Sequence, residues 1–312
     1  MTCFYDARGN IYGVISPALL RSKGIEVPNS AALAANSRSA WALAAIASEC
    51  GWGSLPRPPE AKAHRCDGLL VGPFQAEPPF DLLIVNTDGS LAERSGNGLT
   101  IFAQALTDQG LLSQACELYV HHDKSDALSP VVTPVEPAVY EQVQGFWLAL
   151  GRPEFGPLEM VSQLSAIHPD WNHSQFVRVG NPHCVTLVQQ ASALPGNLQM
   201  HQPALFEPLK AIAFAPPGGG GRPCVDGVNL QWAMREMHSR VIARVFERGE
   251  GPTASSGTSA SAVACAAWRA GWVKAGEVEV VMPGGTAPVR LHAGAGELLS
   301  VSLFGTAQRQ VV

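Results

Sequence analysis

Two segments of this sequence share an unusual order, in which a polar, glycine-rich turn leads directly into a helix of small apolar residues. The first turn ends in Ser-Gly-Asn-Gly at residues 95–98, and the second ends in Ser-Gly-Thr-Ser at residues 256–259. A Gly-Asn turn precedes each of them at a comparable distance, at residues 9–10 and 180–181. About half of the chain separates the two copies. An internal repeat of this kind indicates a duplicated lobe.

The segments between these turns indicate a mixed α/β fold. Short apolar runs bounded by turn residues predict strands, and the clearest lie at residues 82–85, 146–150, 184–188, 241–246 and 298–303. A chain of 312 residues is long enough for two domains. The proline-rich stretch 129–137 is the best candidate for a hinge between them. We therefore expect an N-terminal lobe over residues 1–134, completed by a strand at about 300–312, and a C-terminal lobe over residues 135–299.

Composition argues against several classes of partner. A net charge of −5 and the lack of any Lys/Arg-rich stretch leave no basic surface for nucleic acid. The most apolar helical stretch, residues 31–48, is interrupted by Asn36, Ser37 and Arg38, well short of the roughly 20 apolar residues of a membrane span. The first residues have neither the charged nor the apolar region of a signal peptide. We expect a cytoplasmic protein with neither nucleic acid nor a membrane as its partner.

The cysteines and histidines do not form a recognisable metal-binding or disulfide pattern. Seven cysteines are an odd number, and they contain no Cys-x-x-Cys pair. His121, His122 and Asp123 lack helical ligand spacing and are typical of a solvated turn. We therefore expect buried thiols and no metal.

The two helix starts are suited to bind a carboxylate. A turn of this kind exposes unpaired backbone N–H groups where the helix dipole is positive, so it binds anions. Two such ends facing one carboxylate would acidify the neighbouring α-hydrogen by stabilising an enolate-like dianion. Ser95 and Ser256, each directly before a glycine, would then flank the α-carbon. Either serine alone would be interpreted as an ordinary N-cap, but their repetition favours the functional interpretation.

An ordered set of short motifs matches one known family along nearly the whole chain. The motifs are Arg8-Gly9-Asn10, Cys66-Asp67-Gly68-Leu69-Leu70, Asn86-Thr87-Asp88-Gly89-Ser90, Gly180-Asn181-Pro182-His183-Cys184-Val185, Gly227-Val228-Asn229 and Glu247-Arg248-Gly249. In this set the chain resembles the diaminopimelate epimerases. The resemblance implies two pseudo-symmetric lobes, each a sheet wrapped around a central helix, with the active site in the cleft between them. It also implies a cofactor-independent epimerase or racemase.

The two reacting positions differ from the family pattern. Members of the family have a cysteine at each, one removing the α-proton and the other delivering a proton to the opposite face, whereas this chain has Ser95 and Ser256. The second motif also has Ser259 where the family has glycine. Forming an alkoxide in place of a thiolate costs on the order of 7 kcal/mol or more. The resemblance places His183 and Glu247 beside the reacting centre, so we expect them to activate Ser95 and Ser256, respectively.

The resemblance also implies a set of residues that recognise the substrate. Arg248 would pair with a carboxylate and Glu247 with an ammonium group, while asparagines serve either. The expected binding residues are Asn10, Asn86, Gly96, Asn97, Asn181, Asn229, Arg248, Gly257 and Thr258. The expected substrate is a small amino acid or related carboxylic acid, with diaminopimelate among the candidates. The oligomeric state stays open, a homodimer included.

Four other interpretations of the sequence are open to test. Two of them are an isomerase or dehydratase of another small carboxylic acid and a catalytically silent paralogue that binds amino acids. Alternatively, both serines were engineered from cysteine, although Ser259 argues for natural divergence. A serine hydrolase is disfavoured because neither serine lies in a Gly-x-Ser-x-Gly turn.

Overall fold

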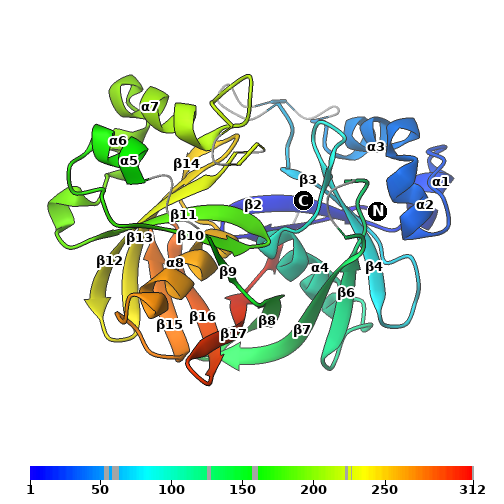
Figure 1. The fold of residues 1–312 in the computed structure, drawn as a ribbon. Helices are drawn as coiled ribbons and strands as arrows, with labels where there is room; N and C mark the ends of the chain where they lie inside the picture. The colour runs from blue at the N-terminus through cyan, green and yellow to red at the C-terminus, as the bar shows by residue number, and fades with distance from the viewer. Residues whose placement is uncertain are drawn as a thin grey trace. The chain divides into compact units, whose positions relative to one another are not determined.

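The computed structural model describes residues 1–52, 56–57, 63–124, 128–156, 161–221, 224–225 and 227–310, with no side chains given at 161 and 162. The chain divides into two compact units (Figure 1). One comprises Met1–Leu148 together with Gly305–Val312, and the other comprises Ala149–Phe304. Across the described ranges, no helix is both long enough and apolar enough to span a membrane.

The first unit is built on one mixed sheet. Its strands are β1 (Cys3–Ala7), β2 (Asn10–Ile15), β3 (Gly68–Val71), β4 (Phe80–Asn86), β5 (Leu91–Ala92), β6 (Cys116–Val120), β7 (Val131–Tyr140), the start of β8 (Val143–Gly151) and β18 (Gln308–Arg309). They pair in the order β18-β1-β2-β3-β4-β6-β7-β8, and β5 adds to β4. The pairs β2/β3 and β4/β6 are parallel, and the others are antiparallel.

Helices cover both faces of this sheet. Helix α4 (Gly96–Asp108) packs on one face, against β1, β2 and β18. Helices α1 (Pro17–Ser22), α2 (Ala31–Asn36) and α3 (Ala42–Glu49), with the 3-10 turn η1 (Arg38–Ala40), complete a second core around Trp41. Strand alternation divides the apolar residues between the two faces. Leu69 and Val71 join the Trp41 core, whereas Leu70 lies against the first turn of α4.

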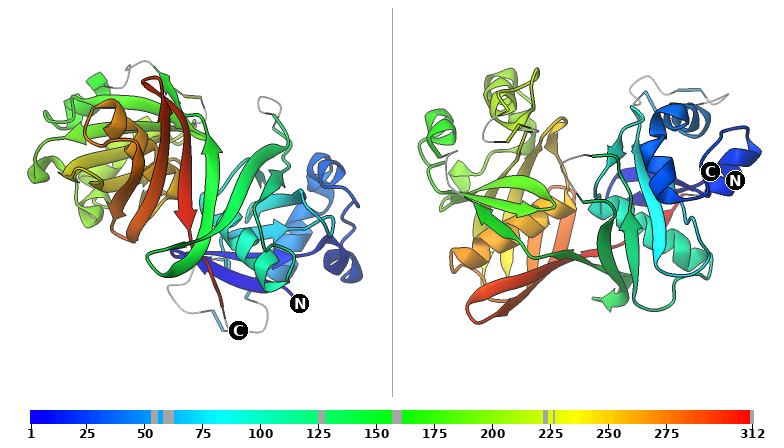
Figure 2. Two further views of the ribbon diagram at one scale, coloured as in Figure 1. Left: turned by 90° about the horizontal axis from the view of Figure 1, so that it is seen from below. Right: turned by 45° about the vertical axis from the view of Figure 1, so that its right-hand side comes forward.

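The second unit repeats this topology. Its strands are β9 (Glu154–Gly156), β10 (Ser174–Val179), β11 (Asn181–Val188), β12 (Asn229–Met237), β13 (Arg240–Glu247), β14 (Gly251–Thr253), β15 (Gly276–Met282), β16 (Gly285–Gly294) and β17 (Glu297–Gly305). They pair in the order β9-β10-β11-β12-β13-β15-β16-β17, with β14 added to β13. The parallel pairs, β11/β12 and β13/β15, correspond to those of the first unit. Both ribbon views in Figure 2 show the hairpin of β16 and β17 within this unit.

Helix α8 (Gly257–Arg269) is the central helix of the second unit. Its residues from Gly257 to Ala267 are all buried, and it contacts six strands of the sheet. Small side chains make this close packing feasible, because eight of its thirteen residues are Gly, Ala or Ser. The opposite face is covered by α5 (Val161–Ile167), η2 (Ala191–Ala193), α6 (Asn197–Met200) and α7 (Pro203–Ala213), which enclose a core around Trp171 and Trp232.

These observations confirm the expected fold class, and the strands expected at 82–85, 146–150, 184–188, 241–246 and 298–303 all lie within strands. Each unit is one copy of a duplicated α/β lobe. The stretch proposed as a hinge contributes to β7 from Val131 onward, and the boundary between the compact units falls at 148/149. Prolines are tolerated in β7 where the ladder does not require an N–H donor at that residue.

Candidate functional site

The first helix start lies beside the beginning of strand β2. The hairpin of β1 and β2 turns through Arg8 and Gly9, whose φ angles of +55° and +86° fit a two-residue turn of the type favoured in hairpins. This turn places Asn10 as the first residue of β2. The Asn97 side chain, from the first turn of α4, donates a hydrogen bond from Nδ2 to Asn10 Oδ1 at 2.6 Å. The structure thus brings together two of the predicted binding residues.

Ser95 is the N-cap of α4. Its Oγ accepts a hydrogen bond from the Gly98 N–H at 3.0 Å. The N–H groups of Gly96 and Asn97 lie in the same first turn, where the helix itself offers no acceptor, so they are suited to an anion. Gly98 leaves room for the cap, because a Cβ there would lie 3.2 Å from Ser95 Oγ.

Asn86 occupies the end of β4 and closes the turn that follows. Its Nδ2 donates to Ser90 Oγ at 2.9 Å, and its carbonyl accepts from the Gly89 N–H at 2.9 Å. Within the described residues, no hydrogen bond joins Asn86 to Asn10 or Asn97. Asn86 therefore has a local turn-forming role in this structure, and turn formation is a common role of asparagine.

The second unit gathers three predicted binding residues at neighbouring strand ends. Asn181 begins β11, Asn229 begins β12, and Arg248 directly follows β13. The backbone N–H of Arg248 donates to Asn229 Oδ1 at 2.9 Å, and its Nη2 donates to Asn181 Oδ1 at 3.1 Å. These bonds hold the guanidinium in a defined orientation. A guanidinium of this kind is the preferred partner of a carboxylate.

Glu247 and Ser256 form a second association in this unit. Burial raises the pKa of the Glu247 carboxyl above its ordinary value, while a hydrogen bond with the Ser256 side chain and the charge of Arg248 partly oppose the rise. A carboxylate with a raised pKa is a stronger base at neutral pH than an exposed one. Ser256 itself is buried and precedes α8 as its N-cap residue. In contrast to Ser95, it makes no side-chain capping bond within the described residues.

His183 is fully buried on β11, two residues after Asn181 and on the same face of the strand. Burial and the nearby Arg248 cation lower its pKa from 6.5 to about 3. His183 is therefore neutral at pH 7, contrary to the expectation that it titrates near neutrality. A neutral imidazole with so low a pKa is a poor proton acceptor, although it remains a good hydrogen-bond partner.

Two residues that the sequence interpretation did not select, Gln231 and Ser259, are linked to this histidine, Gln231 directly and Ser259 through Gln231. Gln231, on β12, lies 3.1 Å from His183 Nδ1 and 3.0 Å from Ser259 Oγ. All three residues are fully buried. Two features of the sequence could have indicated these residues. Ser259 adds a hydroxyl at a helix start, and Gln231 is a glutamine within the largely apolar first part of strand β12.

Gly257 and Thr258 form the first turn of α8, as predicted for a binding helix start. A Cβ at Gly257 would lie 2.4 Å from Leu303 Cδ2, so the close packing of helix and strand β17 requires glycine at this position. Thr258 is 6% exposed. The N–H groups of this turn are equivalent by position to those of Gly96 and Asn97.

Cys184, His121 and His122, which the sequence offered as other reactive or ligating residues, have structural surroundings. Burial raises the pKa of Cys184 to about 12, so it is a thiol at neutral pH. His121 Nε2 contacts Asp81 at 3.0 Å, and His122 Nε2 contacts the Leu128 carbonyl at 3.0 Å. A search of the described residues finds no cluster of three potential metal ligands.

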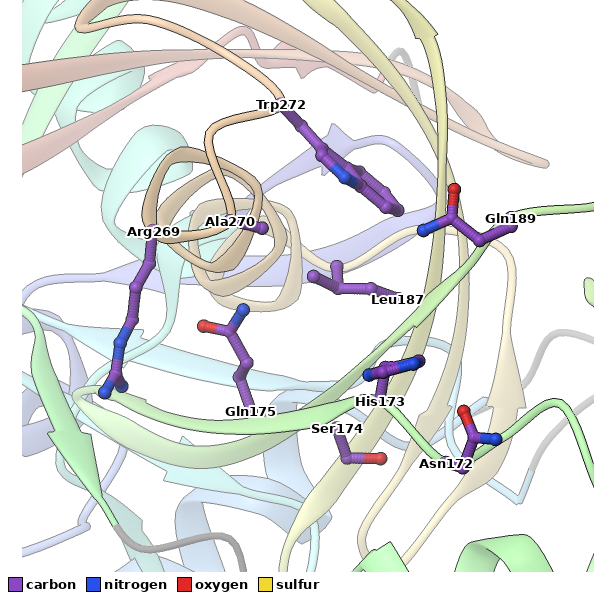
Figure 3. A pocket seen from close by; sticks show the side chains of 9 residues that line it. All are labelled: Asn172, His173, Ser174, Gln175, Leu187, Gln189, Arg269, Ala270 and Trp272. Atoms are coloured by element: carbon purple, nitrogen blue, oxygen red, sulfur yellow. The ribbon is translucent and has the colours of Figure 1, made fainter.

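A cavity of about 410 Å³ in the second unit lies away from the predicted residues (Figure 3). Its lining residues are Asn172, His173, Ser174, Gln175, Leu187, Gln189, Arg269, Ala270 and Trp272. Figure 3 shows Gln175 and Leu187 reaching it from neighbouring strands, and Arg269 from the end of α8. Ser256 precedes the opposite end of this helix, which is about 1.5 Å long per residue. The cavity therefore does not belong to the helix-start site.

Comparison with known sequences identifies clear relatives. The family model described as diaminopimelate epimerase matches residues 175–309. Diaminopimelate epimerase 2 from Nostoc sp. is 30% identical over 230 residues, covering 70% of this chain and 72% of that protein. Diaminopimelate epimerase from Halothermothrix orenii is 28% identical over 236 residues, covering 70% and 74%.

Solved structures share the fold at low sequence identity. A phenazine biosynthesis protein of the PhzF family from Bacillus anthracis has a TM-score of 0.59 at 13% identity, covering 100% of this chain and 98% of that one. A hydroxyproline epimerase from Agrobacterium vitis with bound trans-4-hydroxy-L-proline has a TM-score of 0.55 at 13% identity, covering 99% and 88%. At these identities, the similarity establishes the fold alone.

Proposed function

Because the chain belongs to the diaminopimelate epimerase family, a family of isomerases, we propose that it is a cofactor-independent isomerase that moves the α-proton of a small amino acid. Diaminopimelate is the first substrate to test. The observation that carries this proposal is the cluster in the second unit, where an oriented guanidinium and a carboxylate with a raised pKa accompany a helix start. Together they offer a carboxylate-binding group, a base and backbone donors.

We assign proton transfer in the second unit to the pair Glu247 and Ser256. Glu247 takes the α-proton, directly or through Ser256. In the second case, the Ser256 oxygen accepts the α-proton while its own hydroxyl proton passes to Glu247, so no free alkoxide forms. The electron pair of the C–H bond enters the substrate carboxylate as an enolate-like dianion, which the N–H groups of Gly257 and Thr258 stabilise. Return of a proton to carbon completes the exchange.

The first unit has a helix-start group of its own. Ser95 Oγ accepts from Gly98 N–H, which leaves its hydroxyl proton available for donation. We propose Ser95 as the proton-donating residue of the first unit, with Gly96, Asn97 and Asn10 as its binding residues. Asn181, Asn229 and Arg248 are proposed to hold the non-reacting end. The proposed role of His183 changes from a base to a hydrogen-bond acceptor, because it is neutral at pH 7.

Deuterium incorporation from heavy water tests the proposal. The protein is incubated in D₂O with LL-diaminopimelate, meso-diaminopimelate and a panel of small amino acids, and α-deuteration is followed by NMR and mass spectrometry. We expect exchange of the α-proton for deuterium with at least one amino acid, and we expect Ser256→Ala to lose this exchange. Ser30→Ala is the matched control, since Ser30 is an N-cap of α2 outside the site. Absence of exchange across the panel, with the protein folded, would contradict the proposal.

A second candidate is an isomerase or dehydratase of another small carboxylic acid. It is favoured by the serine at both reacting positions, because a more acidic C–H bond tolerates a weaker acid and base than an unactivated amino acid does. The same incubations with hydroxy acids and unsaturated acids distinguish the two candidates. A product with changed connectivity would support the second, and changed stereochemistry would support the first. Saturable binding without exchange or product would instead indicate a silent paralogue.

A further inference from the structure

His183 belongs to a chain of buried polar side chains that links strands β11 and β12 with helix α8. β11 and β12 are parallel, with His183 opposite Asn229 and Val185 opposite Gln231. His183 and Gln231 therefore share a face of the sheet, the one against which α8 packs. Ser259, in the first turn of α8, reaches the same glutamine. The three side chains form a chain of polar groups in the interior, where each is 0% exposed.

The orientation of the Gln231 amide follows from its neighbours. One end of the amide faces two backbone carbonyls, those of Cys184 and Asn229, each at 3.3 Å. Carbonyl oxygens only accept hydrogen bonds, so the NH₂ group must point toward them. The amide oxygen then faces His183 Nδ1 at 3.1 Å and Ser259 Oγ at 3.0 Å, and it accepts a hydrogen bond from each. In this arrangement, all four contacts pair a donor with an acceptor.

This orientation fixes the position of the imidazole proton. A neutral histidine carries one proton, and the oxygen of Gln231 requires it on Nδ1. Nε2 is left with a lone pair. Nε2 is buried and has no hydrogen-bond partner among the residues that the structure describes. Buried acceptors are normally satisfied, so this one points to a donor that the described residues do not supply.

We infer that Gln231, held by Ser259, is a positioning residue that fixes His183 in the Nδ1–H tautomer, so that Nε2 accepts a hydrogen bond from the ammonium group of a bound amino acid. The inference rests on the proposed function for the nature of the ligand. The neighbouring guanidinium of Arg248 is suited to a carboxylate, so the acceptor and the cation together match both charged groups of a zwitterion. An acid that lacks an amino group leaves Nε2 unsatisfied, which makes this pair a determinant of specificity.

Side-chain NMR of protein labelled with ¹⁵N-histidine tests the tautomer directly at pH 7. His183 is identified by its absence in His183→Gln. We expect its Nδ1 to be protonated and its Nε2 to resonate as an unprotonated nitrogen. Gln231→Leu removes the acceptor and should abolish this preference, whereas Gln231→Glu keeps an acceptor and should retain the Nδ1 proton while raising the pKa of His183. A proton on Nε2 in the unmodified protein would overturn the inference. His183→Gln serves only to assign the resonances, and the unchanged signals of the other histidines show that it is folded.

The ligand is tested in the same spectra with LL-diaminopimelate and with pimelate, which has the same carboxylates but no amino groups. We expect the Nε2 resonance to move upon addition of LL-diaminopimelate and not upon addition of pimelate. Equal shifts with both compounds, or no shift with the amino acid, would overturn the role of Nε2 as an ammonium acceptor. If the tautomer and the shift are as expected but no α-proton exchange occurs, the proposed function fails while this inference stands.

Discussion

At the scale of single residues, the most informative group is the Glu247 carboxyl. Its raised pKa means that the ionised form is disfavoured in the folded protein relative to the unfolded chain. Stability is therefore lost as the pH rises from the unfolded pKa, about 4.3 for glutamate, through the higher folded value. We expect Glu247→Gln to raise the Tm at pH 7 and to leave it unchanged near pH 3.5, where the unmodified carboxyl is already protonated. Thermal unfolding at both pH values checks this, and a lower Tm at pH 7 would contradict it.

The same substitution should remove the base. General-base groups contribute about 10²- to 10⁴-fold, so we expect Glu247→Gln to reduce α-proton exchange by at least about 100-fold. In the unmodified protein, exchange should increase with pH through the raised pKa of Glu247, because only the ionised carboxyl accepts a proton. A flat pH profile from 4 to 8 would exclude Glu247 as the base.

Substitution of Arg248 should affect substrate binding more than the rate of proton transfer. Lysine lacks the planar fork that reaches Asn181 while the backbone N–H remains bound to Asn229. We expect Arg248→Lys to raise KM by about tenfold, equivalent to roughly 1.4 kcal/mol, with a smaller effect on kcat. Arg269→Lys is the matched control, because Arg269 lines the cavity at the other end of α8. Steady-state kinetics of both variants test the assignment, and equal KM values would contradict it.

At the scale of secondary structure elements, the two helix starts differ although their sequences are alike. Ser95 caps α4, and Gly98 provides the space for this bond, because a Cβ there would lie 3.1 Å from Ser95 Cβ. The equivalent residue in α8 is Ser259, which has a Cβ at the position where α4 has none. Ser256 makes no side-chain cap, and its hydroxyl instead interacts with the Glu247 carboxyl, lowering the pKa of that group against the effect of burial. One added side chain thus distinguishes a serine that caps its helix from one that does not.

Exchanging the two residues tests this explanation. We expect Ser259→Gly to allow Ser256 to cap α8, to weaken its bond to Glu247 and so to raise the pKa of that carboxyl further. The pH profile of exchange would then shift toward higher pH. Gly98→Ser should remove the cap of α4 and cost about 1 kcal/mol of stability, measured by urea unfolding. An unchanged pH profile in Ser259→Gly would contradict the proposed crowding.

These elements also separate what the sequence can predict from what it cannot. The helix starts at Ser95 and Ser256 and the strand at 184–188 were visible because turn residues and apolar runs are local signals. The role of Gln231 was not visible, because it depends on a side-chain contact, made across a parallel strand pair, between residues that lie 48 positions apart in the sequence. The neutral state of His183 was missed for the same reason, since complete burial is a property of packing. Residues 129–137 were interpreted as a hinge from their prolines, yet most of them extend as β7.

At the scale of the whole molecule, the first unit is closed by the last part of the chain. β18 pairs with β1, with Tyr5 opposite Arg309, and the Gln310 N–H donates to the Phe4 carbonyl at 2.8 Å. We expect deletion of residues 306–312 to increase amide hydrogen exchange in β1, β2 and α4 while leaving β11 to β13 protected. Equal loss of protection in both units would show that they unfold as one.

The division of the chain also determines the order in which its parts are synthesised. The second unit is one uninterrupted segment, and it lies between the two pieces of the first. A ribosome therefore delivers every residue of the second unit before it delivers β18. The first unit therefore lacks β18 until the second unit has been synthesised in full. During translation, the half of the molecule that carries Glu247 and Ser256 can finish folding while the half that carries Ser95 still has an unpaired edge at β1.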